Sequence, residues 1–118
     1  MITINGIEIN IDFTDADIIE KIDQAGEKVR KKIEELEKNK KDITPAEGIR
    51  QECEILKEFL DYVIEDGISK KIFGDRNSLK ECLQAFEDIT EEKNKQYEDI
   101  QIAYNKYSPD RLKRWIYF

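Results

Sequence analysis

The sequence predicts a mainly α-helical protein, with an N-terminal β-hairpin followed by an antiparallel three-helix bundle that has a long C-terminal helix. Three observations support this fold class. Isoleucines alternate with polar residues on both sides of Asn5-Gly6, apolar residues then recur at three- and four-residue steps, and Ser108-Pro109 ends the last such stretch. The length of 118 residues predicts a single domain, divided into the hairpin (1–13), the helical bundle (15–107) and a basic-aromatic tail (108–118).

The first 13 residues, MITINGIEINIDF, have the pattern of a hairpin. Asn-Gly accepts the positive φ angles of a tight two-residue turn, and the alternation places every isoleucine of this stretch on one face. A hairpin alone is only marginally stable in water. We therefore expect its isoleucine face to pack on the helices of this chain or on another subunit.

The apolar period changes at Thr14-Asp15, where either residue can cap a helix. A stripe of apolar residues then follows at the spacing of one helix face, which predicts a first helix that ends near Asn39. The stripe consists of Ile18, Ile22, Ala25, Val29, Ile33 and Leu36.

The second helix has the clearest start signal. Thr44-Pro45-Ala46-Glu47 has a capping residue, a proline at the first helical position and a glutamate three residues after the cap. Gly67 is expected to end this helix, because glycine adopts the left-handed conformation without strain. A short extra turn is expected at 68–73.

A third helix is predicted from Asn77 or Ser78 onward, with a buried face made of Leu79, Cys82, Leu83, Phe86 and Ile89. Its second half is rich in Glu, Lys and Gln and keeps only a sparse apolar stripe. We expect this stripe either to form a shallow binding surface for a partner or to pack along the first helix. The stripe consists of Tyr97, Ile100, Ala103 or Tyr104, and Tyr107.

The last segment, SPDRLKRWIYF, has three basic residues and one acidic residue on a chain with a net charge of −7. Trp, Tyr and Arg are the residue types that dominate binding hot spots, so the segment is a candidate partner-binding peptide. The alternatives are that its aromatic residues fold back on the bundle or contact another copy of the chain, or that the segment is disordered. The candidate binding residues are Arg111, Arg114, Trp115, Tyr117 and Phe118, with Lys113 beside them.

The composition argues against several classes of protein. The excess of 27 acidic over 20 basic residues does not suit phosphate binding, so no nucleic-acid partner is expected. No stretch approaches the ~20 apolar residues of a membrane span, and the alternating N-terminal segment does not have the pattern of a signal peptide. We expect a cytoplasmic protein.

The sequence offers little reaction chemistry. It contains no histidine, the commonest general base and metal ligand, and no glycine-rich phosphate loop. Cys53 and Cys82 are expected to be reduced core thiols, although a disulfide stays open. The sequence therefore predicts no catalytic residue, no cofactor and no enzyme activity, while a site for magnesium or calcium made only of carboxylates stays open.

One stretch resembles a known group of proteins. Residues 67–86 contain Gly67-Ile68-Ser69, then Ile72-Phe73-Gly74, Arg76, Ser78-Leu79, Cys82-Leu83 and Ala85-Phe86. This run, together with the short Ile-rich start and the long acidic helix before it, resembles small proteins from the tail gene clusters of phages and prophages of Gram-positive bacteria. The resemblance implies a tail assembly chaperone in the host cytoplasm, which keeps the tape-measure protein soluble until the tail tube forms. It implies no catalytic residue.

Two other functions fit the sequence. The chain could be a structural virion component, such as a tail completion or connector protein, in which the isoleucine face of the hairpin joins a sheet across subunits. It could also be an acidic inhibitor that mimics nucleic acid, although Lys alternates with Glu along the first helix. The chaperone and the virion component are both expected to act as homo-oligomers.

Overall fold

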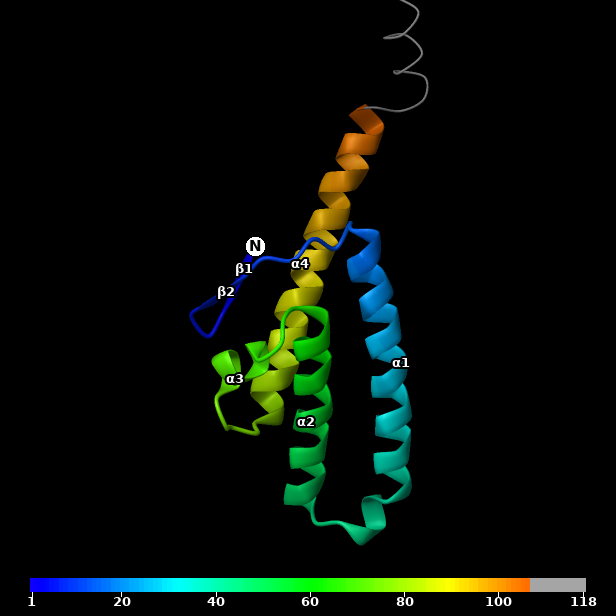
Figure 1. Ribbon diagram of the computed structural model, residues 1–118, viewed down its shortest axis with the longest axis vertical. Coiled ribbons are helices and arrows are strands. Elements are labelled where there is room, and N and C mark those ends of the chain that lie inside the picture. Colours follow the sequence, from blue (N-terminus) through cyan, green and yellow to red (C-terminus); the bar gives the residue numbers. More distant parts are fainter. Residues whose placement is uncertain (107–118) are drawn as a thin grey trace, which may run out of the picture.

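The computed structural model describes residues 1–106 and has the predicted fold class. A hairpin of two short antiparallel strands, β1 (Ile2–Ile4) and β2 (Ile7–Ile9), precedes the helices. The main helices are α1 (Ala16–Lys38), α2 (Pro45–Val63) and α4 (Leu79–Lys106); a 3₁₀ turn (Lys40–Asp42) follows α1, and the short helix α3 (Ile68–Phe73) precedes α4. Figure 1 shows α1, α2 and α4 as long rods, with the hairpin beside α4.

The hairpin forms for the reason the sequence predicts. Asn5 and Gly6 both have positive φ angles, 49° and 78°, and the register pairs Ile4 with Ile7 and Ile2 with Ile9. All four isoleucines therefore lie on one face, and Ile4 and Ile9 are buried in the core of this chain. The sequence left open whether this face packs on the chain's own helices or on another subunit, and in the structure it packs on the chain's own helices.

The predicted helix starts are also confirmed. Asp15 caps α1 by accepting a hydrogen bond from the backbone N–H of Asp17 at 2.8 Å, and Thr44 caps α2 by accepting one from the N–H of Glu47 at 3.2 Å. The side chain of Glu47 does not complete a reciprocal capping box, because it accepts hydrogen bonds from Arg50 and Gln51.

The end of α2 differs from the prediction. The helix stops at Val63, before Gly67, whose φ of +83° places it at the start of α3. The glycine has the expected left-handed conformation, but it lies in the turn that leads into α3 and does not end α2. The extra turn expected at 68–73 is confirmed as α3.

Helix α4 runs parallel to its neighbour α2, whereas the sequence predicts an antiparallel bundle. Helices α1 and α2 are antiparallel, but Cys53 lies beside Cys82 and the Phe59 ring lies 5.2 Å from the Phe86 ring, so α2 and α4 run the same way (Figure 1). The connection through α3 brings the chain back to the middle part of α2, where Lys57 bonds Arg76 and Asn77, before α4 begins. As a result, α2 lies between α1 and α4, and the end of α4 projects beyond the bundle.

The core lies where the hairpin, α2, α3 and the first half of α4 meet. Residues 10–15 cross α4 from the hairpin to α1, and we call this segment the strap (Figure 1). Ile11 and Phe13 of the strap are buried with Leu60, Ile72 and Phe73. Among residues 1–106, no helix is both long and apolar enough to cross a membrane.

Candidate functional site

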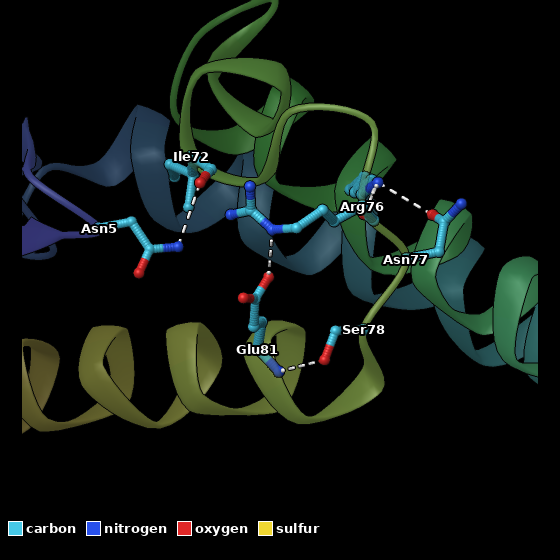
Figure 2. Close-up of polar contacts among 7 residues, drawn as sticks. Asn5, Ile72, Arg76, Asn77, Ser78 and Glu81 are labelled. Carbon is cyan, nitrogen blue, oxygen red and sulfur yellow. Dashed lines mark hydrogen bonds and ion pairs between the residues drawn. The ribbon is translucent and has the colours of Figure 1, made fainter.

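The corner between α3 and α4 is held by contacts within the chain (Figure 2). Lys57 of α2 donates hydrogen bonds to the carbonyl of Arg76 at 2.6 Å and to Oδ1 of Asn77 at 2.9 Å. The Arg76 side chain donates to Glu81 at 3.2 Å, and Ser78 caps α4 by accepting a bond from the Glu81 N–H. These polar groups position the start of α4, which the sequence predicts at Asn77 or Ser78.

Helix α3 is fixed from both sides. Asp61 of α2 accepts hydrogen bonds from the backbone N–H of Ser69 at 2.9 Å and from its hydroxyl at 3.0 Å. On the other side, Asn5 at the hairpin turn donates to the carbonyl of Ile72 at 3.1 Å (Figure 2). Ser69 is buried, so this carboxylate pairing satisfies polar groups that would otherwise be costly to bury.

Leu83 corrects one sequence expectation. The helical spacing predicts Leu83 on the buried face of the third helix, but the residue is 54% exposed. The buried face of α4 instead runs through Cys82 and Ala85, with Leu79 and Ile89 partly buried beside them. Leu83 lies about 100° around the helix from Cys82, which turns it away from the hairpin and the core.

The two cysteines offer no reactive thiol. Both are free and buried, and their side chains lie next to each other between α2 and α4. Burial raises the pKa of Cys82 to about 12, and the neighbouring Cys53 adds to the rise. A thiol held in this form is a poor nucleophile and a poor metal ligand. Within residues 1–106, no group of three or more Cys, Asp or Glu side chains is arranged to hold a metal ion.

The predicted partner-binding stripe lies on the part of α4 that leaves the bundle. We call residues 97–106 the α4 tip. Tyr97, Ile100 and Tyr104 are 42%, 38% and 68% exposed and recur at steps of three and four residues along one side of it. The structure thus places these three residues together on one exposed face of the helix end that projects beyond the bundle (Figure 1). Ile102, which the sequence analysis did not select, is 64% exposed and lies on the other side of the tip.

The other candidate binding residues lie outside the described residues. Tyr107 directly follows the α4 tip, and the tail residues follow it in sequence. They are Arg111, Arg114, Trp115, Tyr117 and Phe118.

Two polar residues of α4, neither of them predicted from the sequence, hold the N-terminal segment: Gln96 binds the strap and Glu92 binds the terminal amine. Gln96 accepts a hydrogen bond from the Phe13 N–H at 2.8 Å and donates one to the Ile11 carbonyl at 2.8 Å. Glu92 accepts a bond from the terminal amine of Met1 at 2.8 Å and another from Gln96 at 3.2 Å. The bond from the amine, followed by that from Gln96, lowers the pKa of the Glu92 carboxyl.

The sequence does contain a signal for this pair. Counting from Cys82 and Ala85, steps of four, three and four residues lead through Ile89 to Glu92 and Gln96, so the polar pair continues the buried face of α4. Polar residues at core positions need partners, and here the strap backbone supplies them for Gln96 and the terminal amine of Met1 supplies one for Glu92. The last residue that binds the strap is Gln96, and the exposed tip begins at the next residue.

A groove runs between α1 and α2 and was not predicted. It consists of two adjoining hollows of about 240 and 310 Å³, both of which include Lys32, Ile55 and Glu58. We call it the α1–α2 groove. The end near the C-terminus of α2 is mainly apolar, and the end near the α1–α2 turn is mainly acidic. The apolar end is lined by Ala25, Lys28, Val29, Phe59 and Tyr62, and the acidic end by Glu35, Leu36, Asn39, Gln51 and Glu54.

The charges along this groove are partly paired. Lys32 forms an ion pair with Glu58 across the middle, and the ammonium of Lys28 lies 5.2 Å from the centre of the Tyr62 ring. Within residues 1–106, Glu35 and Glu54 form no ion pair. The groove therefore presents two unpaired carboxylates at one end and an aromatic, weakly cationic wall at the other.

Comparison with known proteins places the chain in a family. No curated protein and no solved structure matches the chain significantly. One protein family matches it over nearly its whole length, and that match includes the hairpin turn, all the helices and most of the tail. Because its residues 5–116 match the family's sequence model, the chain belongs to the family of unknown function DUF6673.

Proposed function

We propose that this chain is a protein-binding assembly factor without catalytic activity, and that the α4 tip is the surface on which it binds a helical segment of its partner. One observation carries this proposal: Tyr97, Ile100 and Tyr104 form an exposed stripe on the end of α4 that projects beyond the bundle (Figure 1). Aromatic and aliphatic anchors at i, i+3 and i+7 are the pattern by which amphipathic helices dock against one another.

The stability of a projecting helix end also favours a partner. Isolated helices shorter than about 12 to 15 residues are only marginally stable in water, because helix nucleation is costly. The ten residues of the α4 tip are held from the bundle side alone, through the helix that continues from Gln96. A partner that covers the stripe would stabilise the tip and remove its apolar surface from water.

The resemblance of residues 67–86 to tail-cluster proteins suggests the partner. On this proposal the chain is a tail assembly chaperone of a phage or prophage, its partner is the tape-measure protein, and it acts in the cytoplasm of the host bacterium. The structural virion component is less well supported, because the isoleucine face that would have joined a sheet between subunits is buried in the chain's own core. An acidic mimic of nucleic acid is also less well supported, since Arg30 pairs with two glutamates of α1 and Lys32 pairs with one of α2.

The test is co-expression with the tape-measure protein of the same phage or prophage. The wild-type chain should raise the soluble fraction of that protein, and Tyr97→Ser/Tyr104→Ser should abolish the gain. Lys95→Ser/Asp99→Ser is the matched control, because it changes two polar residues away from the stripe and leaves the net charge unchanged. Equal solubility of the tape-measure protein with and without the chain would contradict the proposal, as would stoichiometric amounts of the chain in purified particles.

A further inference from the structure

The α1–α2 groove has no role in the function proposed above, and its chemistry is unevenly distributed along its length. Its acidic end has the unpaired carboxylates of Glu35 and Glu54, and its apolar end has the rings of Phe59 and Tyr62. A ligand that matches this groove would be an extended segment with cationic groups at one end and aromatic groups at the other.

We propose that the α1–α2 groove binds the C-terminal segment 108–118 of a second copy of this chain. In this segment the basic residues Arg111, Lys113 and Arg114 come first, and the aromatic residues Trp115, Tyr117 and Phe118 follow. Guanidinium groups bind carboxylates through paired hydrogen bonds, which suits Glu35 and Glu54. The aromatic residues suit the apolar end, where Lys28 already lies against one ring and can accept another.

The order of these residues distinguishes a second copy from the chain's own tail. Because α4 runs parallel to α2, the C-terminal end of α4 lies beyond the C-terminal end of α2, which is the apolar end of the groove (Figure 1). A tail that came directly from its own α4 would enter at the apolar end. In that direction its basic residues would come to the apolar end first and its aromatic residues would follow, which is the reverse of the order that the groove favours. The tail of another copy can enter at the acidic end, where each half meets its complementary side chains.

The length of the segment supports the same choice. Lys106 is 20 residues beyond Phe86, so it lies about 30 Å along the helix axis from the level of the Phe59–Phe86 contact. Trp115 is nine residues beyond Lys106, which gives it a reach of about 30 Å when fully extended. The chain's own Trp115 could therefore only just return to Phe59, with no length left to cross from α4 to the groove.

This inference is independent of the partner proposed for the α4 tip, because the two surfaces share no residue. Loss of tape-measure binding after substitution of Tyr97 and Tyr104 would leave the groove intact. In the same way, substitutions in the groove should not affect the stripe. The failure of one proposal is therefore distinguishable from the failure of the other.

Trp115 provides the measurement, since it is the one tryptophan of the chain. In the full-length protein its fluorescence should shift to shorter wavelength as the concentration rises, in step with growth of the species by light scattering beyond 14.0 kDa. Glu35→Lys/Glu54→Lys should weaken self-association by roughly tenfold or more and return the emission to that of exposed tryptophan. Asp23→Lys/Glu37→Lys is the control, because it makes the same charge change on exposed positions of α1 turned away from the groove.

A mixing experiment separates a second copy from the chain's own tail. One chain carries Glu35→Lys/Glu54→Lys and keeps Trp115, and the other keeps the groove but carries Arg114→Ala/Trp115→Ala. Neither alone should show the emission shift, and a mixture of the two should restore it. A shift that is independent of concentration and is not restored by mixing would assign the groove to the chain's own tail and overturn the proposal. Emission from exposed tryptophan at every concentration, or self-association unchanged by Glu35→Lys/Glu54→Lys, would overturn it as well.

Discussion

Substituting Gln96 with alanine is expected to detach the strap from α4. The amide side chain of Gln96 makes two hydrogen bonds of 2.8 Å to strap backbone, one with the N–H of Phe13 and one with the carbonyl of Ile11. Both strap residues are buried, at 2% and 6% exposure, so their backbone groups have little access to water. Gln96→Ala removes both partners and leaves the rest of α4 with a good helix former.

The expected loss of stability follows from these two bonds. A typical intramolecular hydrogen bond contributes about 1 kcal/mol, and a buried group left without a partner costs about 1 to 3 kcal/mol. Two bonds therefore give a loss of about 2 to 4 kcal/mol in the free energy of unfolding. At about 4 °C per kcal/mol for a chain of this size, the melting temperature should fall by about 8 °C or more.

Urea unfolding followed by far-UV circular dichroism measures this loss, and hydrogen exchange locates it. The Phe13 amide should lose protection in Gln96→Ala while amides in the middle of α2 keep theirs relative to global stability. Gln84→Ala is the matched control, because Gln84 is exposed on the same helix and its side chain bonds to Asp88 one turn away. A loss below about 0.5 kcal/mol for Gln96→Ala is the range of ordinary surface substitutions, and it would show that the two hydrogen bonds from Gln96 to the strap do not stabilise the fold.

Four further substitutions or conditions test other parts of the fold. Phe73→Ala should cost about 3 to 5 kcal/mol in urea unfolding, because the ring is almost fully buried at the corner, and a loss below about 1 kcal/mol would contradict this packing. Thr44→Ala should cost about 1 kcal/mol by removing the α2 cap, and Thr44→Ser should restore most of it. The folded-state pKa of Glu92 lies below its ordinary value of 4.5, so the stabilisation from its carboxylate is present above that pH and is lost as the pH falls through the folded value. The difference in the free energy of unfolding between wild type and Glu92→Gln should therefore shrink on acidification, and a constant difference would argue against this linkage. Cys53 and Cys82 should react with a thiol reagent at pH 8 only as the protein unfolds, and rapid labelling of either in the folded protein would show that the pair is accessible.

The parts of the fold that the sequence predicts are those set by local chemistry. Asn5-Gly6 determines its turn because few other residue pairs accept two positive φ angles, and Thr44 determines a helix start because its hydroxyl reaches an N–H three residues away. Helix starts, the hairpin and the extra turn at α3 were therefore predictable. Each depends on residues close together in the chain.

The parts that could not be predicted depend on contacts between distant residues. The parallel direction of α2 and α4 results from how α3 packs, and no local pattern encodes it. Leu83 is apolar and has helical spacing, but its exposure depends on which side of α4 the hairpin covers. The same holds for the α1–α2 groove, since a groove depends on the separation of two helices as well as on their sequences.

The candidate binding surface was predictable only in part. The stripe of Tyr97, Ile100 and Tyr104 is evident in the sequence, where its spacing fits either a partner surface or packing along the first helix, and the structure places these residues on one exposed face. The role of Gln96 was missed, because a polar residue in a charged helix has the same appearance in sequence whether it faces water or a strap backbone 83 residues away.

The attachment of the strap to α4 has a consequence for the order in which the chain acquires its structure. During synthesis, the hairpin and strap leave the ribosome before the residues of α3 and α4 to which they are bonded, which extend from Ile72 to Gln96. Their isoleucines must therefore stay exposed until α4 has been made, and the loop that then closes includes most of the chain. The hairpin and strap are thus synthesised before the helices that they pack on but become ordered after them, and the nascent chain depends on its Asp and Glu residues to stay in solution until then.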